Sequence, residues 1–112
     1  MPYQSRQLGR VFHALADPTR RKVVERLRDG PASMTELARP FAMALPSFAQ
    51  HLGVLERSGL VRSRKAGRVR TYRFVPRPLQ EAEDWMGKQR AIWERRLDQL
   101  DRYVTQLKDE AP

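Results

Sequence analysis

The stretch TELARPFAMALPSFAQHLGVLERSGLVRSRKAGRVRTYRFV, which spans residues 35–75, decides the fold. Its first part predicts a short helix that Thr35 caps and that Pro40, lying inside it, shortens or kinks. Pro46 then opens a second helix, which repeats apolar residues at helical spacing and ends at Gly59. Two short helices joined by a turn are the pattern of a helix-turn-helix.

The rest of the stretch predicts a two-stranded β-hairpin. Polar and apolar residues alternate over residues 61–65 and 70–75, around a turn that contains Gly67. A two-stranded ribbon is marginal by itself, so it must pack on the helices as a wing. Residues 57–80 hold no acid, and we expect the bases nearest the tip to contact phosphates or the minor groove. These bases are Arg64, Lys65, Arg68 and Arg70, and Arg62 and Arg73 lie farther from the tip.

Two more helices are predicted ahead of this stretch. Residues 4–16 form an amphipathic helix, and Asp17 and Pro18 are a good N-cap and a good first residue for the next one. The bases at positions 20–22 either touch backbone phosphates or form a solvated face. The stripe of the first helix consists of Leu8, Val11, Phe12 and Leu15.

One long helix is predicted from Leu79 to about Leu107, with apolar residues recurring every seven positions. At about 1.5 Å per residue it reaches roughly 40 Å, so part of its stripe needs a cover from outside the small core. A second copy of the chain is the economical cover. The expected interface comprises Leu8, Val11, Phe12, Leu79, Trp85, Met86, Ile92, Trp93 and Leu100.

The distribution of charge supports an acidic polymer as partner. The 112 residues carry 22 Lys and Arg against 13 Asp and Glu, which gives a net charge of +9. Residues 1–76 hold a balance of +10 and residues 77–112 a balance of −1, so we expect a DNA-binding domain followed by a dimerisation helix. No stretch resembles a membrane span or a signal peptide, and we expect a cytoplasmic protein.

The helix that opens at Pro46 is expected to enter the major groove of duplex DNA. Gln50 can donate to and accept from an adenine edge, which makes it the best candidate for a base contact. Ser47 can reach a base or a phosphate, and Ala49 can touch a thymine methyl group. His51 is the fourth candidate contact on this helix. Plain alternatives remain open: Gln50 is a surface glutamine, and His51 is a ring packed at the helix edge or a donor of a single phosphate bond. Thr35 is a further candidate contact to DNA.

The strings FHALADPTRR at residues 12–21, TELA at 35–38 and LPSFAQHLGVL at 45–55 resemble the ArsR/SmtB family of winged helix-turn-helix repressors. The string GRVRTYRF at residues 67–74 is similar to the family's wing. The resemblance implies a mainly helical fold with a small hairpin. It also implies a homodimer, joined through the first and last helices, that binds a palindromic operator.

The chain departs from the metal-sensing members of that family. It has no cysteine, and the third helix reads LARP at residues 37–40, where those members carry cysteines. The last helix has carboxylates but no histidine. We therefore expect a subgroup that does not sense metal and needs no cofactor. Ala49 also stands where many members have serine.

Other classes of function remain to be weighed. The winged fold can serve as a protein-interaction adaptor, or as an architectural DNA binder that does not read sequence. An enzyme is the least expected class, because the sequence shows neither a catalytic triad nor a phosphate-binding loop. Trp85 and Trp93, with the first helix, would line a cleft for an unknown apolar effector, although aromatic residues at helical spacing are more often core or interface.

Overall fold

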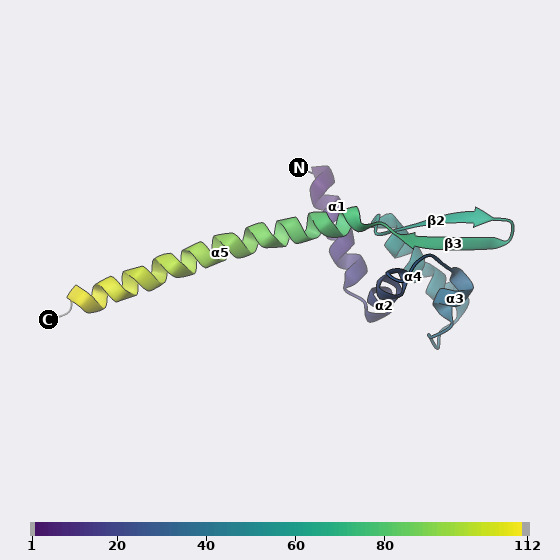
Figure 1. The fold of residues 1–112 in the computed structure, drawn as a ribbon, viewed down its shortest axis with the longest axis horizontal. Helices are drawn as coiled ribbons and strands as arrows, with labels where there is room; N and C mark the ends of the chain where they lie inside the picture. The colour runs from purple at the N-terminus through teal and green to yellow at the C-terminus, as the bar shows by residue number, and fades with distance from the viewer. Residues whose placement is uncertain (1, 111–112) are drawn as a thin grey trace. The chain divides into compact units, whose positions relative to one another are not determined.

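The computed structural model describes the backbone of residues 2–110 and the side chains of residues 6–110. It is mainly helical, with a small antiparallel sheet and a long C-terminal helix, which confirms the predicted fold class (Figure 1). The elements are α1 (Pro2–Leu15), α2 (Pro18–Leu27), β1 (Ala32–Ser33), α3 (Met34–Ala38), α4 (Leu45–Arg57), β2 (Val61–Ala66), β3 (Val69–Phe74) and α5 (Pro76–Glu110).

The chain divides into two compact units, residues 1–82 and residues 83–112. The first holds the helix-turn-helix, the sheet and the first turns of α5. The second holds the rest of α5. Among the described residues, no helix is both long enough and apolar enough to cross a bilayer.

The sheet has three strands in the order β1-β3-β2, not the two that the sequence predicted. The hairpin itself is confirmed, with Val61 opposite Phe74 and Ala66 opposite Val69. The third strand, β1, pairs Ala32 with Tyr72 on the other edge of β3. Two residues are too few to show a period of two, so no alternation marks β1 in the sequence.

The core of the first unit lies between the helices and the inner face of the sheet. As the spacing predicted, α4 buries Phe48, Leu52 and Leu55, each at most 1% exposed. Further buried side chains from the other helices, from all three strands and from the residue before β2 complete this core. They are Val11, Ala14, Val23, Leu27, Ala32, Leu37, Leu60, Val61, Tyr72 and Ala82.

The start of α3 differs from the prediction. Ser33, not Thr35, is the N-cap: its Oγ accepts from the Glu36 amide at 3.1 Å, and Glu36 Oε1 accepts from the Ser33 amide at 3.2 Å. This reciprocal pair is a capping box, whose signature Ser-x-x-Glu is present in the sequence. The backbone and hydroxyl of Ser33 hold the pKa of Glu36 below its ordinary value, more strongly than partial burial raises it.

Proline shapes three other helix ends. The prediction that Pro40 lies inside α3 is wrong, because the helix ends at Ala38; a proline has no amide hydrogen with which to continue it. Pro46 is the second residue of α4, which begins one residue earlier than predicted. Pro76 is the first residue of α5, which begins three residues before Leu79. The first turn of a helix tolerates proline because its amides have no partner there.

Candidate nucleic-acid interface

The exposed side of α4 carries the candidate base-reading side chains. Ser47 and Gln50 are exposed, whereas Ala49 and His51 are half-buried. The buried face of the same helix fixes their direction, and the ring of Phe48 packs at 5.4 Å, between centroids, on Phe41 from the preceding turn. Ser47 and Gln50 are thus presented to solvent from a helix anchored on its other side.

The wing extends from the helices as a hairpin closed by a tight turn (Figure 1). Gly67 has a φ of +63°, a left-handed conformation that a residue with a side chain adopts with strain. A pocket of about 350 Å³ lies between the wing and α3, and it brings Thr35 together with Lys65, Arg68 and Arg70. Four candidate contacts from distant parts of the sequence thus line one surface.

Arg64 lies apart from those four. Successive side chains of a strand point to opposite faces, so Arg64 shares the other face of the sheet with Arg62 and Arg73. Arg62 and Arg73 are direct partners in the register of the hairpin. The predicted set of tip bases is therefore divided between two faces of the wing.

A short chain of hydrogen bonds connects the wing to α4. Arg70 Nη1 donates to Ser63 Oγ at 2.8 Å, and Ser63 Oγ donates to Glu56 Oε2 at 3.1 Å. Glu56 belongs to α4 and Ser63 to β2. Arg70 is therefore tied to the helix that carries Gln50.

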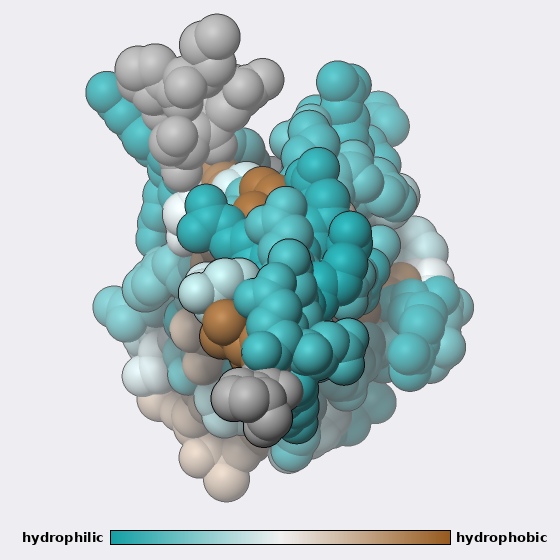
Figure 2. All heavy atoms as spheres, turned by 90° about the vertical axis from the view of Figure 1, so that its left-hand side faces the viewer, coloured by the Kyte–Doolittle hydropathy of each residue, from teal (hydrophilic) through white to brown (hydrophobic). Residues whose placement is uncertain are grey.

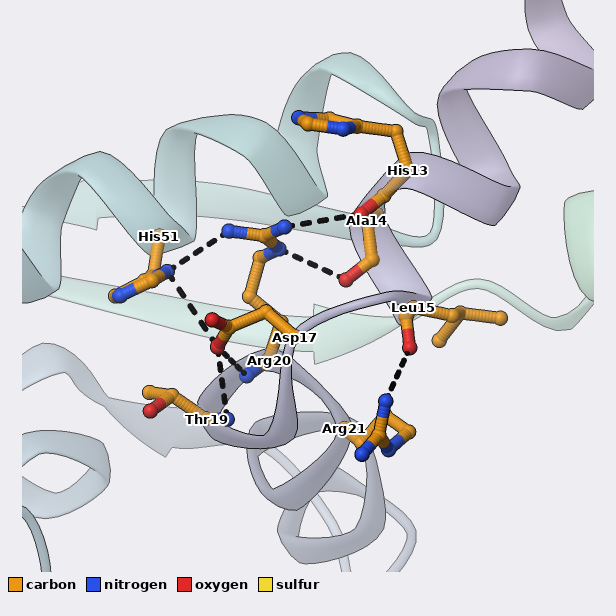
Figure 3. A network of polar contacts seen from close by, with 8 residues as sticks. All are labelled: His13, Ala14, Leu15, Asp17, Thr19, Arg20, Arg21 and His51. Atoms are coloured by element: carbon orange, nitrogen blue, oxygen red, sulfur yellow. Dashed lines mark hydrogen bonds and ion pairs between the residues drawn. The ribbon is translucent and has the colours of Figure 1, made fainter.

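His51 belongs to a polar network at the junction of α1, α2 and α4 (Figure 3). Arg20, only 8% exposed, donates from Nε to the Ala14 carbonyl at 2.8 Å and from Nη2 to the His13 carbonyl at 2.9 Å. Its Nη1 lies 2.9 Å from His51 Nδ1. Because a guanidinium only donates, His51 accepts at Nδ1 and carries its hydrogen on Nε2.

This network corrects the two interpretations for Arg20 and leaves both open for the exposed Arg21 and Lys22. Arg20 is neither a phosphate contact nor a solvated residue, because it is buried and hydrogen-bonds the end of α1 and His51 of α4. Arg21 donates to the Leu15 carbonyl at 2.8 Å, and Lys22 is exposed. The sequence shows that all three residues are basic but not which of them is buried, so it does not distinguish Arg20 from Arg21 and Lys22.

Asp17 caps α2 as predicted and completes the network. Its Oδ2 accepts from the amides of Thr19 at 2.8 Å and Arg20 at 3.2 Å, and lies 3.8 Å from His51 Nδ1. Desolvation raises the pKa of the Asp17 carboxyl, but the amides of Arg20 and Thr19 and the charge of Arg20 together hold it below its ordinary value. The charged carboxylate is therefore the form that the fold favours.

The candidate interface residues fall into two groups. Val11 is 1% exposed and belongs to the core of its own unit, so it is not available to a partner; Leu8 and Leu79 are half-buried against that core. Phe12 and the remaining candidates on α5 are between 36 and 64% exposed. Those on α5 are Trp85, Met86, Ile92, Trp93 and Leu100. Figure 2 shows hydrophobic side chains scattered among hydrophilic ones on the face that it presents.

A family model described as a helix-turn-helix domain matches residues 15–64. Known regulators of transcription also resemble this chain, among them the three that follow. The HTH-type transcriptional regulator Rv2034 of Mycobacterium tuberculosis is 46% identical over 74 residues, which are 66% of this chain and 69% of that protein. The transcriptional repressor SdpR of Bacillus subtilis is 30% identical over 79 residues, 70% of this chain and 88% of SdpR. The crystal structure of an ArsR family transcriptional regulator matches with a TM-score of 0.76 at 49% identity, over 84% of this chain and 94% of that one.

Proposed function

Because the chain belongs to the ArsR family of winged helix-turn-helix transcriptional regulators, we propose that it is a homodimeric repressor that binds a palindromic operator. In this proposal α4 reads base edges in the major groove, and the wing holds the sugar-phosphate backbone beside it. Residues 1–76 bind DNA, and residues 77–112 join the two copies.

The observation that carries the proposal is the anchoring of Gln50 and Arg70 on one framework. Gln50 is exposed on a helix whose other face is buried, and Arg70 is tied to that helix through Ser63 and Glu56. A base-reading side chain and a phosphate-binding cation are thus held in a fixed relation. Such pre-positioning reduces the conformational entropy lost on binding.

A palindromic operator requires two copies, and the surface of α5 supports their pairing. Trp85, Ile92 and Trp93 are 45, 39 and 64% exposed in a single chain. Large apolar side chains gathered on one helix are typical of an interface between proteins. Covering them in a two-fold dimer would present two copies of α4 to the two halves of an operator.

Regulation without metal is supported by the residues present. The sequence has no cysteine, and the last helix has no histidine. Among residues 6–110, His, Asp and Glu side chains do not come together in groups of three. We expect the same operator affinity after dialysis against a chelator and after addition of Zn²⁺, and a tenfold change on adding Zn²⁺ would contradict this part of the proposal.

The test of the proposed function is a band shift with DNA from upstream of the chain's own coding region. A fragment of the same length and base composition in scrambled order is the control. We expect the upstream fragment to bind at least about a thousandfold more tightly, at one moderate salt concentration. Equal affinity for both fragments would indicate an architectural binder, and no binding by a folded dimer would favour an adaptor of other proteins.

A further inference from the structure

The two nitrogens of the His51 ring lie in different surroundings (Figure 3). Nδ1 points into the junction of α1, α2 and α4, where it lies 2.9 Å from Arg20 Nη1 and 3.8 Å from Asp17 Oδ2. Nε2 points away from that junction and has no hydrogen-bond partner among the described residues. Every buried side-chain nitrogen and oxygen in the described part of the chain has a partner, so Nε2 must reach solvent.

Arg20 and Asp17 favour opposite tautomers of the His51 ring. A guanidinium only donates, so its bond requires a bare Nδ1 and leaves the hydrogen on Nε2. A carboxylate only accepts, so a bond to Asp17 would require the hydrogen on Nδ1. A separation of 2.9 Å is a hydrogen bond and one of 3.8 Å is not, so the bond with Arg20 sets the tautomer.

Both competing groups are held in place by other bonds. Arg20 is 8% exposed, and its Nε and Nη2 donate to the backbone carbonyls of Ala14 and His13, which leaves Nη1 directed at the ring. Asp17 Oδ2 accepts from the amides of Thr19 and Arg20 as the cap of α2. The guanidinium therefore reaches Nδ1 while the carboxylate is kept at the end of its helix.

His51 lies on the flank of α4, next to the candidate base reader Gln50. Phe48, Leu52 and Leu55 define the buried side of the helix. Gln50 projects away from that side, and His51 is turned from Gln50 by about 100° toward α2. In a major groove the outermost side chain of a helix meets base edges, whereas a side chain on the flank meets phosphates. A single N–H at Nε2 matches a phosphate oxygen there.

We propose that Arg20 is a positioning residue for DNA binding, which holds His51 in the tautomer whose Nε2–H donates to a phosphate oxygen of the operator. Arg20 itself does not touch the DNA. The inference rests on the DNA binding of the proposed function and adds a buried residue that acts through His51. Without Arg20, Asp17 would be the charged neighbour of Nδ1. The hydrogen would then move to Nδ1, and Nε2 would turn a lone pair toward the phosphate.

The tautomer can be measured with Arg20 in place. The sequence holds two histidines, and the other one, His13, is exposed, so a His13→Gln variant leaves one ring to observe. Nitrogen-15 spectra distinguish a ring nitrogen that carries hydrogen from one that does not. At about pH 8.5, where imidazoles carry one hydrogen, we expect it on Nε2, with a coupling across the bond between Arg20 Nη1 and His51 Nδ1. Hydrogen on Nδ1 would overturn the proposal.

His51→Ala tests the phosphate contact at the same pH. Binding should weaken about tenfold on the operator and on unrelated duplex alike, because a phosphate contact carries no sequence information. The slope of log affinity against log salt should not change, because a neutral donor displaces no counterion. His13→Ala is the matched control and should bind like the unaltered chain. A loss confined to the operator, or a slope reduced by about one unit, would contradict a neutral ring on a phosphate.

A second pair of variants separates positioning from packing. Arg20→Met removes the guanidinium, and it should weaken DNA binding about tenfold and move the ring hydrogen to Nδ1. In His51→Gln an amide nitrogen takes about the place of Nε2 and donates whatever its neighbour, so adding Arg20→Met there should cost less than about twofold. An equal loss in both backgrounds would show that Arg20 acts only through packing.

These affinities are compared at a temperature at which circular dichroism shows each variant folded. If Arg20→Met does not fold, the coupling between Arg20 and His51 in the His13→Gln chain decides, and its absence overturns the proposal. A chain that selects its operator but carries the ring hydrogen on Nδ1 overturns the role of Arg20 and leaves the repressor intact. Equal binding to operator and scrambled DNA, weakened on both by His51→Ala, overturns the reading of sequence and supports the role of Arg20.

Discussion

In the proposed function, the reading of sequence depends most on Gln50. Changing it to alanine should relax the preference for one base pair, at a cost of about 1–3 kcal/mol for the preferred operator. Affinity for DNA of unrelated sequence should stay nearly unchanged, because phosphate contacts remain. The measurement is a titration of wild type and Gln50→Ala against the operator and against a set with single base-pair changes.

The outcome that contradicts this role is an equal loss of affinity on every sequence. Lys22→Ala is a suitable control, because Lys22 is exposed, lies on α2 and takes no part in the buried network. Its removal should leave the order of preference among operators unchanged.

The contribution of Asp17 to the free energy of unfolding depends on pH. Since the folded state lowers the pKa of its carboxyl below 3.8, the stabilisation is fully present above that value and is lost as pH falls through the lower folded pKa. Asp17→Asn keeps an N-cap but removes the charge. The difference in Tm between wild type and Asp17→Asn should be constant from about pH 7 to 5 and should shrink below pH 3.8.

The control for this measurement is Asp29→Asn, which removes an exposed carboxylate outside the network. A Tm difference for Asp17→Asn that grows toward acid pH would show that the charge does not stabilise the fold.

Some residue roles could be predicted from the sequence and others could not. Asp17 was recognised as a cap, because its role depends on neighbours two and three positions away. The role of Arg20 in connecting α1 with α4 was not predicted, because its acceptors on these two helices are brought to it by tertiary packing. Ser33 was missed although its capping box is local, since Thr35, two residues later, is also of a residue type that caps helices.

Among the elements, the wing is expected to supply affinity without selectivity. Changing the exposed Arg68 to alanine should weaken binding to all duplexes to a similar degree. The slope of log affinity against log salt should fall by about one unit for the lost phosphate contact. Isothermal titrations at four salt concentrations measure both quantities.

Arg73→Ala is the matched control, since it removes an equal charge from the face of the wing that Thr35 and Lys65 do not share. An unchanged salt slope for Arg68→Ala would place the turn of the hairpin away from the phosphates.

Periodicity explains which elements could be predicted. The helices with clear apolar stripes and the hairpin with strict alternation were all expected from the sequence, with ends displaced by a few residues. The two-residue β1 was not, because its strand conformation comes from pairing with β3 and not from its own pattern.

At the scale of the whole molecule, assembly should depend on α5. Trp93→Glu should weaken association by about 3 kcal/mol, roughly a hundredfold, because one aromatic ring per copy loses its burial. The variant should remain folded, since Trp93 is 64% exposed in the single chain. Analytical ultracentrifugation and circular dichroism measure the two properties separately.

Ala91→Glu introduces the same charge two positions away, on the opposite side of α5. It should leave association unchanged. Equal behaviour of the two variants would show that the Trp93 side of the helix is not the interface.

The link from Glu56 through Ser63 to Arg70 bears on how the operator adapts. In the proposed complex, α4 and the wing are held together by these hydrogen bonds. The protein then does not bend to fit an operator of imperfect shape, so the DNA duplex must deform instead. Base steps that never meet a side chain then influence affinity through the ease with which they kink or narrow. The choice of operator would then depend on the stiffness of the DNA at base pairs that Gln50 does not contact.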